Sequence, residues 1–106
     1  VQRSLGSNHR ERIYQNAVAK AFTNAGLRFT EQHPVKITYA QSDVGLYYLD
    51  FLVESIVIVE LKVRAYFSKS DVEQIYSYLK ALNLKLGILA HFTPDGVKHK
   101  RIVNIR

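Results

Sequence analysis

The sequence predicts an α/β fold in which a mixed β-sheet is flanked by helices. Two apolar runs, at residues 47–53 and 56–59, are separated by a very short connection, which is typical of a β-hairpin. Two other segments, at about 8–25 and 70–82, instead repeat their apolar residues with the period of an α-helix. A chain of 106 residues with these elements is expected to form one domain over residues 1–106, with a modest core.

The first helix is expected from about residue 8 to residue 25. Gly26 follows it, and glycine commonly ends a helix in the left-handed conformation. The side chains expected to face the core are Tyr14, Ala17, Val18, Ala21, Phe22 and Ala25. Glu11 belongs on the inward edge of this stripe at the beginning of the helix, where an acid can also simply complement the helix dipole.

The remaining strands are expected at residues 29–33, 35–39, 84–91 and 98–105. Pro34 cannot donate a hydrogen bond, so it is expected to interrupt the first two. Residues 41–45 predict a turn or loop, and residues 93–96 predict a turn with proline and glycine at favoured positions. The dense charge of residues 98–105 is typical of an edge strand.

The loop of the central hairpin decides which charged residues meet. If only residues 54–55 formed the loop, Asp50 would face away from Glu60, because a register shift of one residue reverses the face. A three-residue loop at 54–56 instead sets Asp50 against Glu60. In that register one face is wholly apolar and carries Leu49, Phe51, Val53, Val57, Val59 and Leu61.

Asp50, Glu60 and Lys62 are therefore expected together at the edge of a buried sheet. Lys62 lies two residues after Glu60, so both side chains project from the same face of the strand. Buried carboxylates lose hydration worth several kcal/mol, and a shared divalent cation would compensate. The alternative is a glutamate–lysine ion pair on a half-exposed strand, which is common and contributes little to stability.

The second helix is expected to open with Ser70 as its N-cap, and Glu73 would close the capping box three residues later. Its buried stripe is Val72, Ile75, Leu79 and Leu82. Gln74 and Tyr78 are four residues apart and share one flank of this stripe, from which they could reach the end of the sheet. Taken alone, they are an ordinary boundary pair.

The composition limits the classes of function. A formal charge of +6 favours a polyanionic partner such as nucleic acid, and the candidate contacts are Arg10, Arg12, Lys98, Lys100 and Arg101. A solvated basic face is the alternative. The absence of cysteine excludes thiolate zinc sites and disulfide scaffolds, and the four histidines show no ligand spacing. No apolar stretch approaches ~20 residues, so we expect no membrane span. We expect a cytoplasmic protein.

The order Glu11, Asp50, Glu60-x-Lys62 and Gln74-x-x-x-Tyr78 resembles the PD-(D/E)XK nuclease superfamily, including the glutamine–tyrosine helix of its exonuclease-like branches. More narrowly, the chain is similar to the GxxExxY proteins. The matching positions are Leu5-Gly6, Glu11, Tyr14, Asp50, 57–62, Gln74, Tyr78, 82–89 and 101–104. Asn8 replaces the first glycine of the family name, and Leu49 precedes Asp50 where the superfamily name has proline.

This resemblance implies a small restriction-endonuclease-like core and a divalent-metal-dependent nuclease, with DNA favoured over RNA as substrate. It implies that Mg²⁺ or Mn²⁺ is bound by Asp50, Glu60, the Leu61 carbonyl and waters. Glu11 would add a ligand directly or through water. Such hard oxygen donors suit magnesium and manganese better than zinc or copper.

The catalytic roles are implied by the same resemblance. Lys62 would orient the attacking water or stabilise the transition state, and Gln74 with Tyr78 would position the lysine or the phosphate. Two alternatives stay open. One is a catalytically silent or partner-dependent nucleic-acid-binding or assembly module on the same fold. The other is a structural protein with an ion triad at these acids. A homodimer would add apolar burial to a small core.

Overall fold

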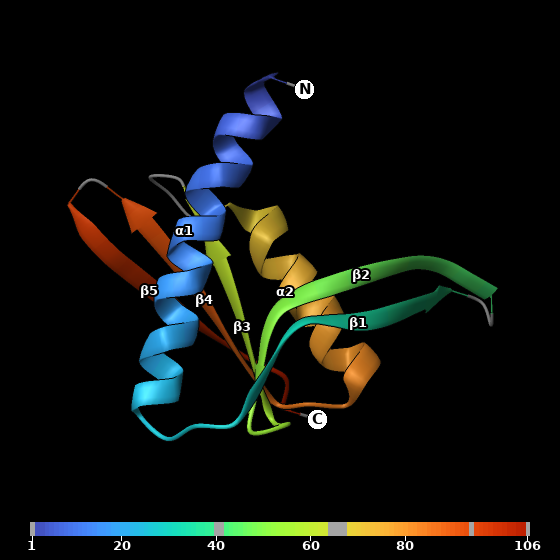
Figure 1. Ribbon diagram of the computed structural model, residues 1–106. Coiled ribbons are helices and arrows are strands. Elements are labelled where there is room, and N and C mark those ends of the chain that lie inside the picture. Colours follow the sequence, from blue (N-terminus) through green and yellow to red (C-terminus); the bar gives the residue numbers. More distant parts are fainter. Residues whose placement is uncertain (1, 40–41, 64–67, 94, 106) are drawn as a thin grey trace.

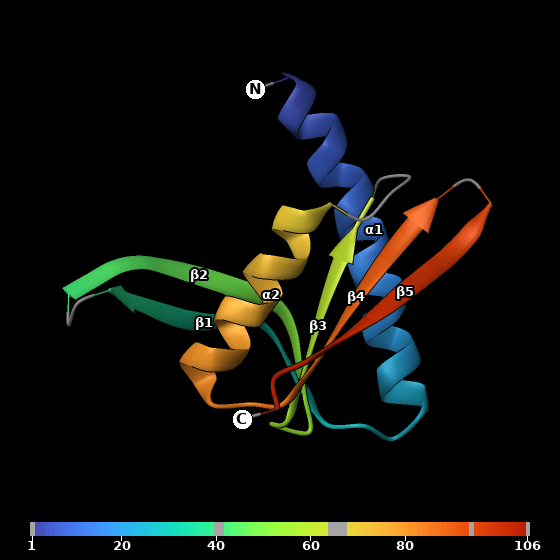
Figure 2. The ribbon, with the colours of Figure 1, turned by 180° about the vertical axis from the view of Figure 1, so that it is seen from behind.

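In the computed structural model, the described part of the chain forms a five-stranded mixed β-sheet with a helix on each face (Figures 1 and 2). The structure describes residues 2–39, 42–63, 68–93 and 95–105, and at residues 2–9, 39, 43 and 44 it describes the backbone alone. The elements in chain order are α1 (Gln2–Asn24), β1 (Phe29–Tyr39), β2 (Ser42–Val53), β3 (Val57–Lys62), α2 (Lys69–Leu82), β4 (Leu86–Thr93) and β5 (Gly96–Val103).

The strands lie side by side in their chain order, and this confirms the predicted mixed sheet flanked by helices. β3 and β4 are parallel, because α2 carries the chain back along the sheet between them, and the other neighbouring pairs are antiparallel. α1 lies in front of the sheet in Figure 1, and α2 lies in front in the opposite view of Figure 2. Neither described helix is long and apolar enough to cross a membrane.

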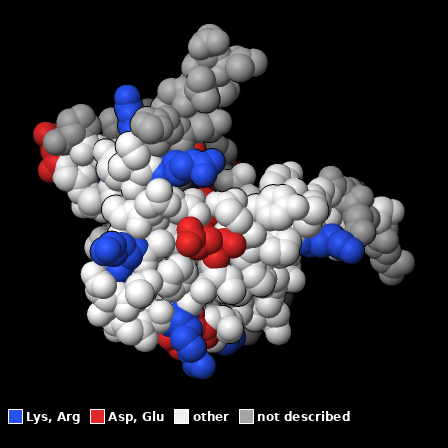
Figure 3. All heavy atoms as spheres, viewed as in Figure 1, with Lys and Arg blue, Asp and Glu red and all other residues white. Residues whose placement is uncertain are grey.

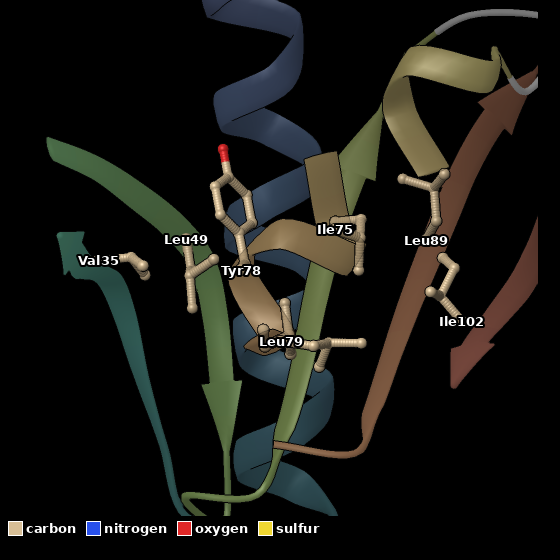
Figure 4. Close-up of a cluster of buried hydrophobic side chains, with 8 residues drawn as sticks. Val35, Leu49, Ile75, Tyr78, Leu79, Leu89 and Ile102 are labelled. Carbon is tan, nitrogen blue, oxygen red and sulfur yellow. The ribbon is translucent and has the colours of Figure 1, made fainter. Parts of the chain in front are cut away.

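Each helix covers its own hydrophobic cluster on the sheet. The cluster on the α2 face consists of Val35, Leu49, Ile58, Ile75, Tyr78, Leu79, Leu89 and Ile102 (Figure 4). On the α1 face, Tyr14, Val18, Ala19 and Phe22 pack over the buried side chains of Phe51, Val53, Val59 and Leu61. The sheet is therefore buried on both faces over β3, as its apolar run predicted.

β2 does not keep a regular alternation of faces. A flat strand predicts that Leu49 shares a face with Phe51, but Leu49 packs on the α2 face and Phe51 on the α1 face. The β1–β2 hairpin curves away from β3 in this region (Figure 1). Gln32 lies between the residues paired with Phe51 and Leu49, and has a positive φ of 51°. The prediction for Leu49 was wrong because the hairpin bends here.

α1 begins at Gln2 rather than near residue 8, and it ends as expected. Gly26 has a φ of 77°, and the Leu27 N–H donates to the Phe22 carbonyl at 3.0 Å, which closes a left-handed cap. The inward stripe is narrower than expected. The larger side chains at every fourth position, Tyr14, Val18 and Phe22, hold the helix against the sheet, so the alanines at 17, 21 and 25 are exposed.

α2 is capped two residues earlier than expected. Ser68 Oγ accepts a hydrogen bond from the Asp71 N–H at 3.0 Å, and Asp71 Oδ2 accepts one from the Ser68 N–H at 3.4 Å. This is the predicted capping box with the same spacing, but Ser70 and Glu73 do not form it. Asn83, with a φ of 58°, ends the helix in the left-handed conformation.

The strand boundaries differ from the predicted ones at four places. β1 runs through Pro34 without a break, and proline is tolerated there because β1 is an edge strand. Residues 42–45 belong to β2 rather than to a loop, and Gln41 lies outside the described residues. β4 begins and ends two residues later than predicted, and β5 two residues earlier, as the expected edge strand. Pro94 of the predicted turn also lies outside the described residues.

Candidate metal and catalytic site

The hairpin of β2 and β3 brings Asp50 and Glu60 together. The strands pair in the register Phe51–Val59, Leu52–Ile58 and Val53–Val57, which confirms the predicted three-residue loop at 54–56. Two residues of this loop, Glu54 and Ser55, have positive φ values of 53° and 61°, which suit the right-handed twist of a hairpin. Continuing the register by one residue sets Asp50 against Glu60.

The two carboxylates each accept a hydrogen bond from the main chain of the opposite strand. The Asp50 N–H donates to Glu60 Oε2 at 3.1 Å, and the Leu61 N–H donates to Asp50 Oδ2 at 2.8 Å. These bonds form where β2 begins to diverge from β3 (Figure 1). Side-chain oxygens thus take the place of main-chain ladder partners, and the two acids are fixed side by side in the fork between the strands.

Glu60 is the more buried acid of this pair, with 6% of its surface exposed. Burial, and then the charge of Asp50, raise the pKa of Glu60 from its ordinary value of 4.5 to about 8. The Asp50 N–H and the Lys62 ammonium act in the opposite direction but do not cancel the increase. A carboxyl group with this pKa holds a proton at neutral pH unless a cation replaces it.

A cleft of about 610 Å³ opens over the acid pair, between α1, β1 and the fork of the sheet. Its lining residues are Glu11, Arg12, Gln15, Asn16, Glu31, Gln32, Asp50, Glu60, Leu61 and Lys62. Figure 3 shows acidic atoms grouped near the middle of this face of the molecule, with Lys and Arg atoms at several places around them. The cleft therefore contains each of the residues that the sequence predicted as a metal ligand, together with Lys62.

Glu11 lies on the exposed part of α1 that lines the cleft. Because α1 begins at Gln2, Glu11 is outside the first turn, and the helix dipole does not account for an acid there. Among the described residues, no three acidic or histidine side chains lie close enough to hold one metal ion. Glu11 thus adds negative charge to the cleft but does not complete a three-carboxylate cluster with Asp50 and Glu60.

Gln15 connects α1 to β1 across the cleft. Its Nε2 donates to Glu31 Oε1 at 3.0 Å, and Gln32 Nε2 donates to its Oε1 at 3.2 Å. Sequence reasoning missed these three residues. Gln15 could have been found, since it lies four residues after Glu11 on the same helix face. Glu31 and Gln32 line the cleft at the point where β1 is irregular, because Gln32 has a positive φ. No sequence pattern predicted this irregularity.

The ammonium group of Lys62 approaches the beginning of α2. Lys62 Nζ lies 3.9 Å from Asp71 Oδ1, and Asp71 Oδ2 lies 3.9 Å from His91 Nε2. Asp71 and His91 are both buried, and His91 is the β4 partner of Lys62 in the parallel pair. Sequence reasoning missed Asp71 and His91. The available signal was that Asp71 precedes Gln74 by three residues and Tyr78 by seven, on one helix face.

Gln74 and Tyr78 are not among the residues that line the cleft. Gln74 is half-buried on α2, whereas Tyr78 is buried in the cluster on the α2 face, where its ring contacts the Tyr47 ring at 5.8 Å. Figure 4 shows the Tyr78 hydroxyl directed away from the rest of that cluster. Burial, followed by the charge of Glu60, raises the pKa of Tyr78 to about 12. Tyr78 is therefore near enough to the acids to be affected by their charge.

The basic residues predicted to contact nucleic acid lie in two separate places. They are Arg10 and Arg12 on α1, and Lys98, Lys100 and Arg101 on β5, and all are exposed. Arg12 also lines the cleft. Residues paired between strands share a face, so Lys98 and Lys100 lie on the α2 side of the sheet and Arg101 lies on the α1 side.

The donor atoms at the acid pair fit a hard divalent cation. Two carboxylates and the nearby Leu61 main chain offer oxygen ligands in an open cleft, and the chain has no cysteine. Mg²⁺ usually keeps several waters and is bound by one or two protein carboxylates, so a third acid is not required. Burial and the charge of Asp50 both raise the pKa of Glu60, and a shared cation would offset both by neutralising the two carboxylates.

The family model of the PD-(D/E)XK nuclease superfamily matches residues 1–103. No curated protein matches the sequence. A solved structure described as SSO0001 superposes with a TM-score of 0.70 at 15% identity, over 94% of this chain and 52% of that one. An alkaline exonuclease from Laribacter hongkongensis, LHK-Exo, superposes with a TM-score of 0.66 at 13% identity, over 90% of this chain and 56% of that one. Its complex with dAMP gives the same values.

The chain therefore spans about half the length of these solved structures. At this level of identity the likeness shows the fold, which is that of nuclease-like proteins. The family match covers nearly the whole sequence, including Asp50, Glu60 and Lys62. On that match, the chain belongs to the PD-(D/E)XK nuclease superfamily.

Proposed function

We propose that this protein is a divalent-metal-dependent nuclease that hydrolyses phosphodiester bonds in nucleic acid, with DNA favoured over RNA. The observation that carries the proposal is the pair of half-buried Asp50 and buried Glu60, fixed side by side in a cleft that Lys62 also lines. Members of the superfamily generally use divalent metals. The preference for DNA is supported by a neighbour of similar fold that was solved with a deoxynucleotide, dAMP.

Asp50, Glu60 and the Leu61 carbonyl would hold Mg²⁺ or Mn²⁺, with waters completing its coordination. Glu11 lines the same cleft and would act through one of these waters. When bound, the cation would polarise the scissile phosphate and make a water more acidic as the attacking group. The two main-chain hydrogen bonds keep the carboxylates in place before the substrate arrives, so little reorganisation is needed during the reaction.

Lys62 supplies the positive charge that the protein itself brings to the reaction. Its ammonium group would orient the attacking water, or donate to the phosphate oxygens on which negative charge accumulates. Gln74 and Tyr78 would position this lysine or the phosphate from α2. Arg10 and Arg12 on α1, together with Lys98, Lys100 and Arg101 on β5, would contact the phosphate backbone.

Within the superfamily we assign the chain to the GxxExxY proteins. The support is the spacing of Glu11 and Tyr14 on α1, where Glu11 lines the cleft and the Tyr14 ring stacks on Phe92 at 4.3 Å. One helix turn thus presents an acid to the site and an aromatic ring to the sheet. Glu11→Gln should weaken metal-dependent activity while leaving the fold stable, and an unchanged metal dependence would remove Glu11 from the site.

A cleavage screen tests the proposed function. The protein is incubated with Mg²⁺ or Mn²⁺ and with single-stranded, duplex and branched DNA, and with the same forms of RNA. Cleavage should require the metal, and its rate should fall strongly in Lys62→Ala but not in Lys85→Ala, which changes an exposed lysine between α2 and β4. Metal-dependent binding without cleavage would favour the partner-dependent module. Equal rates for the protein with and without Lys62 would refute the catalytic assignment.

A further inference from the structure

The side chains of Lys62, Asp71 and His91 form a buried network beside the cleft. The two oxygens of Asp71 are divided between its neighbours, because Oδ1 lies 3.9 Å from Lys62 Nζ and Oδ2 lies 3.9 Å from His91 Nε2. Asp71 is 5% exposed and His91 is 1% exposed. The three residues come from β3, α2 and β4, so the network joins α2 to two neighbouring strands of the sheet.

Helix capping alone does not explain an aspartate at this position. Asp71 accepts a hydrogen bond from the Ser68 N–H, but a neutral side-chain oxygen could do the same. A carboxylate at 5% exposure loses most of its hydration, which is unfavourable without a cationic partner. Among the residues that the structure describes, Lys62 lies at ion-pair distance from Asp71, and its side chain is only 20% exposed. Asp71 therefore places a carboxylate beside the Lys62 ammonium.

This contact has a consequence for the reaction. Lysine carries its charge on a flexible four-carbon stem, and holding that stem in one conformation costs side-chain entropy. Lys62 lines the cleft, and Asp71 Oδ1 lies 3.9 Å from its ammonium nitrogen. The lysine side chain then loses its conformational freedom when the protein folds, so substrate binding does not have to order it.

We infer that Asp71, supported by His91, is a positioning residue that holds the Lys62 ammonium at the edge of the cleft. The inference rests on the proposed function, since it assigns Asp71 and His91 to the same site. It gives α2 a role in the reaction through its first turn, one turn before Gln74.

The test compares Asp71→Asn with Glu73→Gln. Asparagine keeps the size of the side chain and an oxygen for the helix cap, but it removes the charge that faces Lys62. Glu73 is an exposed carboxylate on the same helix, so its neutral variant is the matched control. Asp71→Asn should lower kcat by on the order of 10- to 100-fold with KM nearly unchanged, and Glu73→Gln should match the unmodified protein.

Both substitutions are then repeated in the Lys62→Ala background. If Asp71 acts through Lys62, Asp71→Asn should cause no further loss of the residual rate there. Millimolar Mg²⁺ or Mn²⁺ should raise the Tm of Asp71→Asn as much as that of the unmodified protein, because Asp50 and Glu60 are intact. An equal loss in both backgrounds would mean that Asp71 only caps α2, and an unchanged kcat would equally overturn the inference.

An NMR measurement reads the same contact without activity. The ε-carbon signal of Lys62, assigned by its loss in Lys62→Arg, should move in Asp71→Asn and stay in place in Glu73→Gln. If Asp71→Asn unfolds, His91→Asn leaves the cap untouched and should still move this signal; a fixed signal would overturn the inference. Absence of cleavage by the unmodified protein would instead refute the proposed function, and the NMR result would still decide whether Asp71 holds Lys62.

Discussion

Glu60→Gln should make the metal-free protein more stable at alkaline pH. In the folded protein Glu60 keeps its proton up to a pKa of about 8, whereas the unfolded chain releases it near 4.5. Between these values the folded state binds more protons, so the free energy of unfolding falls as pH rises. The loss begins near pH 4.5 and is complete above about pH 8. Glutamine keeps the shape of the side chain and cannot ionise.

The size of this effect follows from the two pKa values. They differ by about 3.5, and a difference of one in pKa corresponds to about 1.4 kcal/mol. The loss of unfolding free energy caused by ionising Glu60 is therefore at most roughly 5 kcal/mol. Glu60 is 6% exposed, so solvent screens little of this difference. Because part of the Glu60 shift comes from the neighbouring charge of Asp50, we expect Glu60→Gln to gain roughly 2 to 5 kcal/mol at pH 9. Below pH 4.5 the two proteins should be equally stable.

Urea unfolding in the presence of EDTA, at pH values from 5 to 9, measures this difference. Glu73→Gln is the matched control, because Glu73 is exposed on α2 and its loss should not change the pH dependence. Adding millimolar Mg²⁺ or Mn²⁺ should restore stability to the unmodified protein at alkaline pH, since the cation replaces the proton. Glu60→Gln should gain less from the metal.

Parallel stability curves for the unmodified protein and Glu60→Gln would refute this reasoning. They would mean that Glu60 ionises in the folded protein as it does in the unfolded chain, and that Asp50 and burial do not act on it. If the unmodified protein loses stability at alkaline pH but does not respond to either metal, the interaction of Glu60 with Asp50 stands and the metal site is refuted.

Three further outcomes are expected. Gly87→Ala should lower the free energy of unfolding by about 1–3 kcal/mol, because the added Cβ would lie 2.6 Å from the Cγ2 of fully buried Ile75. An unchanged midpoint of urea unfolding would show that the core can adjust. Reversing the charge of Lys100 and Arg101 should weaken nucleic-acid binding and reduce its salt dependence across unrelated sequences, and equal salt slopes in fluorescence anisotropy would exclude β5 from the interface. Gln74→Ala should lower kcat and leave substrate affinity nearly intact; a kcat equal to that of the unmodified protein would mean that Gln74 only packs.

The central hairpin shows how much a local pattern can predict. The alternation of apolar residues and the length of the loop at 54–56 were enough to set Asp50 against Glu60, and the register of β2 and β3 agrees. Both properties depend on a few neighbouring residues, which is why they can be read without the rest of the chain. The left-handed ends of α1 and α2, at Gly26 and Asn83, were predictable for the same reason.

Errors appeared where one element meets another. Leu49 lies on the unexpected face because the β1–β2 hairpin bends, and the alanines of α1 are exposed because the helix touches the sheet along a narrow line. The second helix kept its capping box but formed it two residues earlier, at Ser68 and Asp71. A periodic pattern gives the spacing of a stripe, but packing decides its angle to the sheet.

By itself, the sequence determined the α/β class and the mixed sheet, because these follow from the apolar period within each segment. It also determined the meeting of Asp50, Glu60 and Lys62, which follows from spacing along one hairpin. Only the tertiary structure decided that Gln15 would line the same cleft as Glu11, and that Asp71 would lie between Lys62 and His91. These residues are far apart in the chain, and their meeting depends on the bend of β2 and on the placement of α1 and α2 against opposite faces. No local period encodes those angles, since packing of the whole core sets them.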